Sequence, residues 1–155
     1  MKLAAAVVST AAALLSSCVV TTTIGPFLAD PDLAVERAAA RWEAATGVRR
    51  PAPVVRGALG PIECGKSKTA GGCYTGATKV LQIRVDTSQL QCDALALHEM
   101  GHHLGFMGHH NDTQGAAMSK SAELFACITP QDIEKICLAN DCTKEIPECT
   151  PSDPQ

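Results

Sequence analysis

Metal-assisted hydrolysis needs imidazole ligands and a carboxylate, and both occur in the run His98-Glu99-Met100-Gly101-His102. On a helix, His98 and His102 would project from one face about one turn apart, close enough to share one zinc ion. Glu99 would lie beside them, rotated around the helix, where its carboxylate can take a proton from a metal-bound water. The ion lowers the pKa of that water toward about 7 and polarises a peptide carbonyl. The run therefore predicts a zinc site with Glu99 as the catalytic base and later proton donor.

By itself this spacing is a weak signal, because two surface histidines on a helix would produce it as well. Three features of the surrounding sequence favour a metal site. The run follows an alternating, strand-like segment, lies in a helical pattern that ends at Gly105, and precedes two more histidines, His109 and His110.

Together with Gly105, the run resembles HExxHxxGxxH, the signature of the metzincin zinc peptidases, and in particular of the matrixin-like group. His98, Glu99, His102 and Gly105 match that signature in register. The glycine allows a positive φ, so the chain can leave the helix sharply and return a third ligand to the metal. The resemblance departs at the third ligand, because that position is Gly108 and glycine has no side chain.

Two neighbouring histidines can replace the missing third ligand. Counted from Gly105, His109 needs the smaller insertion, and Asp112 then follows where related sequences often carry aspartate. Counted back from Met118, the family spacing points to His110 instead. We favour His109, because a loop after a ligand tolerates insertions better than the tight turn before it.

The resemblance also implies a role for Met118, as the Met-turn residue that forms an apolar floor beneath the metal without ligating it. A methionine that fills a gap in the core is the alternative. His103 should point away from the metal, as a surface group or as a partner of the ligands. The family fold implied is α+β: a short twisted mixed sheet with an active-site helix, an N-terminal helix and a C-terminal helix.

Local signals predict the elements that position these residues. A helix should begin after Asp30, an N-cap followed by a first-turn proline, and end before Gly47, with Trp42 on its core face. The other predicted elements are a short strand at 53–56, a half-buried strand at 78–86, the active-site helix at 89–104 and a last helix at 129–138.

The ends of the chain carry signals of export. Residues 1–18 resemble a bacterial signal peptide with a lipobox, in which Cys18 is lipidated, and an ordinary secretory signal is the alternative. Both make this an exported protein, either a membrane-anchored lipoprotein of the cell envelope or a secreted one. We expect a linker at 19–29, one metallopeptidase-like domain at 30–139, and a tail rich in cysteine and proline at 140–155.

Eight cysteines in an exported chain of 155 residues predict a disulfide framework. The pairing stays open, and lipidation of Cys18 would leave an odd number. Cys64 resembles a thiol that could occupy the zinc, but a disulfide with Cys73 is favoured because Cys64 sits inside the domain. No CxxC pair occurs, which disfavours a zinc ribbon. The net charge of −3 gives no positively charged surface for a nucleic acid, so we do not expect nucleic acid as a partner. We also expect the protein to be a monomer.

The leading hypothesis is a Zn²⁺-dependent endopeptidase that cleaves extracytoplasmic protein or peptide substrates. The alternative is an inactive metzincin-like lipoprotein that acts as a binding or inhibitory module, for which the displaced third histidine is the main support. A disulfide-stapled module without metal is a third hypothesis. Glu99 favours the first, because a purely structural site needs the ligands but not the carboxylate beside them.

Overall fold

The computed structural model describes residues 28–110, 115–120, 124 and 126–142. Several predicted features lie outside these residues. They are the signal peptide with its lipidation site at Cys18, most of the linker, Asp112, and most of the C-terminal tail. None of the helices within the described ranges combines the length and the apolar character that crossing a bilayer requires.

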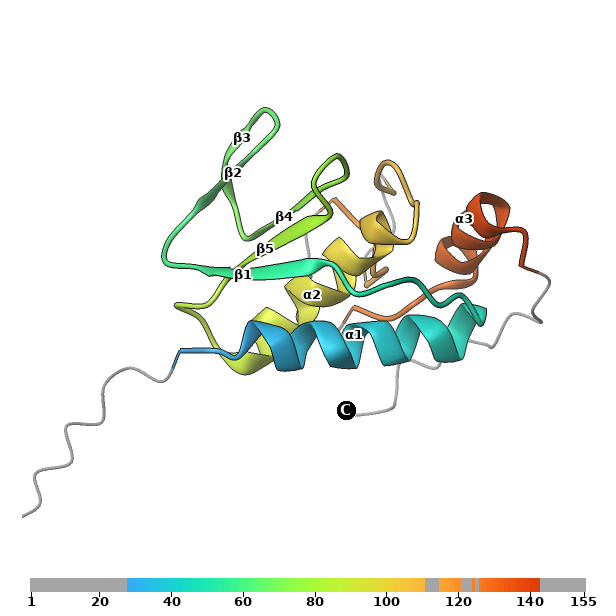
Figure 1. Cartoon of the computed structure of the whole chain (residues 1–155), viewed down its shortest axis with the longest axis horizontal. Helices are drawn as coiled ribbons and strands as arrows, with labels where there is room; N and C mark the ends of the chain where they lie inside the picture. Colours follow the sequence, from blue (N-terminus) through green and yellow to red (C-terminus); the bar gives the residue numbers. More distant parts are fainter. Residues whose placement is uncertain (1–27, 111–114, 121–123, 125, 143–155) are drawn as a thin grey trace, which may run out of the picture.

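The fold is α+β, as the sequence predicts, with three helices and small sheets (Figure 1). Helix α2 packs against both the sheet and helix α1. Helix α3 lies near the C-terminal end of α2. The hydrophobic core lies where these layers meet. The helices are α1 (Pro31–Thr46), α2 (Gln89–His103) and α3 (Pro130–Asn140).

Helix α1 begins and ends as its sequence predicts. The Asp30 side chain accepts a hydrogen bond from the backbone N–H of Leu33 at 3.0 Å, and Gly47 ends the helix with a φ of 73°. Trp42 is fully buried, and its Nε1 donates to the carbonyl oxygen of Leu97 in α2 at 2.9 Å. The prediction that this tryptophan packs α1 onto the core is confirmed.

The main sheet has three strands in the order β1-β5-β4. Its central strand, β5 (Val80–Arg84), buries Leu81 and Ile83 completely and leaves the alternate residues half-buried, which confirms the predicted pattern. Strand β1 (Val54–Ala58) pairs with β5 in parallel, and β4 (Gly72–Thr75) pairs with it antiparallel. The sheet is therefore mixed.

The sequence pattern did not locate β4 or the small hairpin that precedes it, formed by β2 (Ile62–Cys64) and β3 (Ser67–Ala70). The predicted disulfide between Cys64 and Cys73 is confirmed, and it ties this hairpin to β4. A second disulfide links Cys137 to Cys142 at the end of α3. Disulfides of this kind indicate an extracytoplasmic protein.

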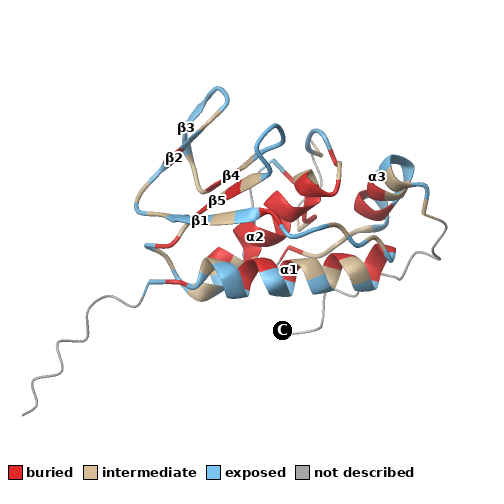
Figure 2. Cartoon of the chain, in the orientation of Figure 1, coloured by how far each residue is buried: buried red, intermediate tan, exposed pale blue. Residues whose placement is uncertain are grey.

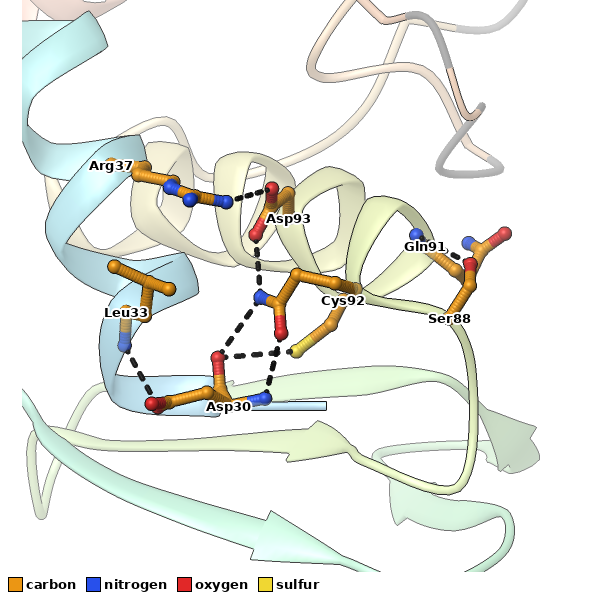
Figure 3. A network of polar contacts seen from close by, with 8 residues as sticks. Asp30, Leu33, Arg37, Ser88, Gln91, Cys92 and Asp93 are labelled. Carbon is orange, nitrogen blue, oxygen red and sulfur yellow. Dashed lines mark hydrogen bonds and ion pairs between the residues drawn. The ribbon is translucent and has the colours of Figure 1, made fainter. Parts of the chain in front are cut away.

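A polar network joins the start of α1 to the start of α2 (Figure 3). The Gln89 side chain accepts from the Asp30 N–H at 2.8 Å and donates to the Asp30 carbonyl at 3.1 Å and to Asp93 at 2.8 Å. Arg37 of α1 pairs with the other Asp93 oxygen at 2.9 Å. The network fixes where α2 begins relative to α1.

Helix α2 changes character along its length. Residues 94–101 are all buried, as Figure 2 shows along the middle of α2. A helix buried on every side is ordinarily apolar throughout, yet His98 and Glu99 lie in this stretch, each only 6% exposed. Hydrophobic burial does not explain why these two polar side chains occupy buried positions of α2.

Candidate metal centre

Three imidazoles converge at the C-terminal half of α2. His98 is buried, His102 half-buried and His109 exposed, and one ligand atom from each lies within 4.8 Å of the others. The Nε2 atoms of His98 and His109 are 3.1 Å apart. These three residues, which the sequence predicted as ligands, are thus positioned to hold a metal ion.

Backbone carbonyls fix the orientation of the two helical imidazoles. His98 Nδ1 lies 2.8 Å from the Ala117 carbonyl oxygen, and His102 Nδ1 lies 2.7 Å from that of Phe106. A carbonyl only accepts, so each Nδ1 carries the proton and each neutral ring keeps its lone pair on Nε2. This arrangement is common for histidines that bind a metal.

Burial keeps these rings neutral. Desolvation lowers the pKa of His98 to about 4, helped by the neighbouring His102. Desolvation also lowers the pKa of the half-buried His102 and, through its partly covered ring, that of His109. At pH 7 the rings therefore offer lone pairs and not positive charges, which is the state that a metal requires.

The distance between the His98 and His109 nitrogens suits a small tetrahedral ion. Two nitrogens bound at about 2.0–2.1 Å to one tetrahedral zinc lie about 3.3 Å from each other, close to the 3.1 Å between His98 and His109. Imidazole donors are typical ligands of zinc and of other late first-row metals. The residues present therefore fit such an ion.

The carboxyl group of Glu99 lies beside the histidines on the same groove. Burial raises its pKa to about 7, and a hydrogen bond from the Tyr74 backbone partly opposes this shift. Strand β4 approaches the carboxyl closely at Gly72, where a Cβ would lie 2.7 Å from Glu99 Oε1. Only glycine leaves room for the carboxyl at this point.

The groove has a volume of about 810 Å³. It extends from the histidines past β4 toward the β2–β3 hairpin, with Leu95 and Tyr74 along one part and Met107 and Lys120 near His109. The wall formed by Gly71 and Gly72 carries no side chains. A peptide backbone could therefore approach both the histidines and Glu99.

Met118 lies under the helix that carries the ligands. It is fully buried, and a Cβ at Gly101 would lie 2.1 Å from its sulfur and 3.2 Å from the Trp42 ring. The glycine in the middle of the histidine motif is therefore a packing requirement. The adjacent Ala117 supplies the carbonyl that orients His98.

The turn after α2 is held from outside the motif. Arg50 donates to the His103 carbonyl at 2.9 Å, and Asn140 of α3 donates to the Leu104 carbonyl at 2.7 Å. Gly105 and Gly108 have φ values of 110° and 140°, as expected for the turn that leads to the third histidine.

His110 and His103, the other histidines of this region, do not join the cluster. His110 Nε2 lies 2.9 Å from Asp132 Oδ1 in α3. His103 is 5% exposed, so a surface position for it is wrong. Its Nε2 donates to the Pro51 carbonyl at 2.9 Å, and the Tyr74 hydroxyl donates to its Nδ1 at 3.2 Å.

Sequence reasoning missed three residues around the site. Asp132 lies in the first turn of the predicted last helix, and its partner His110 is 22 residues away. Gly72 and Tyr74 lie in a stretch where glycines and prolines obscure strand periodicity. No local signal connects any of them to α2.

No family model, curated protein or solved structure matches this chain. Three convergent imidazoles, one buried carboxyl group and an open groove are therefore the observations from which a function can be inferred.

Proposed function

We propose that the chain is a metzincin-like zinc endopeptidase that hydrolyses peptide bonds of extracytoplasmic proteins. His98, His102 and His109 would hold the ion. When bound, zinc supplies an acidified water and a Lewis acid for the scissile carbonyl. The observation that carries the proposal is the position of Glu99, buried beside three convergent imidazoles and open to the same groove.

Glu99 is suited to move a proton in both directions. Without a metal ion, burial raises the pKa of its carboxyl group to about 7, and a pKa near the working pH suits an acid–base catalyst. It would accept a proton as the carboxylate and return it to the leaving amine as the acid. The Tyr74 backbone and the close approach of β4 at Gly72 restrict where the carboxyl can point.

The surroundings of Glu99 support catalysis over a structural role. Among the ion pairs of the described residues, none involves Glu99. A buried carboxyl without a cationic partner destabilises the fold, and a structural metal site would not need it. This favours a hydrolase over the inactive binding module that the displaced third histidine first suggested.

A peptide substrate fits the edge of the sheet. Strand β4 pairs with β5 along one side, and its other side is not paired with a strand among the described residues. Such an edge can add an extended peptide through backbone hydrogen bonds, with the scissile bond near Glu99. A lipid anchor on Cys18, if attached, would keep this activity at a membrane surface.

The test combines metal content with cleavage of an unfolded protein, with and without a chelator. We expect about one zinc per chain and cleavage that the chelator abolishes. Glu99→Gln should keep the metal and lower kcat by roughly 10²–10⁴-fold, while Glu36→Gln, on the exposed face of α1, should change neither. Zinc binding without cleavage by the wild type would favour the binding module, and absence of zinc would remove the site altogether.

A further inference from the structure

Asp132 of α3 is a buried carboxylate whose bonding is fully accounted for. It is 0% exposed, and its Oδ1 lies 2.9 Å from His110 Nε2. Its Oδ2 accepts from the Thr129 N–H at 2.8 Å and from the Thr129 hydroxyl at 2.9 Å. One oxygen therefore caps the helix, and the other is reserved for a histidine on a different segment.

His110 makes contacts through both its backbone and its side chain. The His110 backbone N–H donates to the Met118 carbonyl at 2.9 Å, and its ring meets Phe106 edge-on at 5.1 Å between centroids. Its side chain is only 14% exposed. His110 thus joins the turn after α2, the segment beneath the metal centre and the start of α3.

The neighbouring His109 has the opposite character. It is exposed, and its ring stacks on His98 and meets His102 edge-on, each with centroids 5.0 Å apart. The turn that leads to it contains two glycines with positive φ, so the turn's own backbone preferences constrain it weakly. The fixed point closest to this ligand in the chain is His110.

We propose that His110 and Asp132 are a positioning pair, which holds His109 at the metal by anchoring the adjacent residue to α3. The two neighbouring histidines then have separate functions, one as ligand and one as anchor. This inference rests on the metal centre of the proposed function. It also accounts for a third ligand at residue 109, since the loop is set by its contact with α3 and not by the length of the turn alone.

Zinc affinity, measured by competition with a chromophoric chelator, tests the pair. His110→Ala and Asp132→Asn should weaken zinc binding by roughly 10–100-fold, as expected for groups that orient a ligand. Their Co²⁺ forms should show weakened visible absorption bands, approaching those of His109→Ala, because a ligand is lost from the tetrahedral site. The melting temperature of each apo protein is recorded alongside.

Thr129→Val is the matched control. It removes the hydroxyl contact to Asp132 Oδ2 and weakens the helix cap, but leaves the contact of Oδ1 with His110. It should lower the melting temperature while zinc affinity and the cobalt spectrum stay at wild-type values. If Asp132→Asn does not fold, His110→Ala decides, because it leaves the cap intact.

Wild-type affinity and spectra in His110→Ala would overturn the inference, as would an equal loss of affinity in Thr129→Val. Failure of the proposed function is distinguishable from these results. If the wild type binds zinc but cleaves nothing and His110→Ala loses the metal, the peptidase proposal fails and the positioning pair stands. If the wild type binds neither zinc nor Co²⁺, both fail.

Discussion

The two ends of helix α2 use polar groups for different purposes, in an exposed to half-buried network at one end and among buried and half-buried groups at the other. At the N-terminal end, Gln89 donates to carbonyl and carboxylate oxygens and accepts from a backbone N–H, and Arg37 pairs with Asp93 (Figure 3). Donors there meet acceptors. At the C-terminal end, the Nε2 atoms of His98 and His102 are both acceptors, because each Nδ1–H is used by a carbonyl.

This difference separates a structural network from a binding site. A network whose members satisfy one another needs nothing further and stabilises the fold. Acceptors that converge on one another can share a cation placed between them. Both ends contain polar residues in a helix, so composition alone does not distinguish them, whereas the direction of each hydrogen bond does.

The largest expected effect is loss of the metal when an acceptor at the C-terminal end is removed. His102→Ala deletes one of the three converging imidazoles, so zinc affinity should fall by at least about 100-fold. Isothermal titration of the apo protein with zinc measures this. Affinity equal to the wild type's would show that His102 is not a ligand.

Gly101→Ala should break the packing beneath the same end. The added Cβ would lie 2.1 Å from the Met118 sulfur, so Met118 or the helix must shift. We expect the free energy of unfolding to fall by about 1–3 kcal/mol and zinc affinity to fall with it. Urea denaturation measures the first. In the double variant Gly101→Ala, Met118→Ala the two losses of stability should be less than additive, and additive losses would argue against this clash.

In the apo protein, His98 and Glu99 should change the free energy of unfolding in opposite directions as the pH falls. As pH falls from 7 to 5, unfolded His98 takes up a proton near its ordinary pKa of 6.5, whereas burial holds the folded pKa at about 4, so stability falls. Glu99 acts in the opposite direction. Its folded pKa is about 7 and its ordinary value 4.5, so the folded state already holds a proton that the unfolded state lacks.

Glu99→Gln removes the contribution of Glu99 to this pH dependence, so the loss of stability caused by His98 should become visible. Between pH 7 and pH 5, the free energy of unfolding of the apo variant should fall by about 1–2 kcal/mol more than that of the wild type. Denaturant titrations at fixed ionic strength measure the difference. Parallel curves for the two proteins would contradict a raised Glu99 pKa.

The smallest effect is expected at the N-terminal end. Gln89→Ala removes the bonds to Asp30 and Asp93 at an exposed junction, and should lower the free energy of unfolding by about 1 kcal/mol. Zinc affinity should stay unchanged, because this end supplies no ligand. A loss of affinity comparable to that of His102→Ala would show that the two ends are not independent.

The sequence by itself determined the elements whose signals are local. Asp30 and Thr129 cap helices through residues three positions away, and both helices begin where these caps predict. The alternation around Leu81 gave the central strand. His98, Glu99 and His102 share a single helix, so their spacing was enough to bring them to one place.

Only the tertiary structure grouped His109 and not His110 with His98 and His102, placed His103 against Tyr74 and Pro51, and brought Gly72 against Glu99. Each of these outcomes depends on a contact between segments far apart in the chain. Propensity, capping and periodicity act over a few residues, so these local signals do not distinguish two adjacent histidines in a loop. A buried carboxylate on α3, reached only after folding, contacts His110 and leaves His109 beside the other two imidazoles.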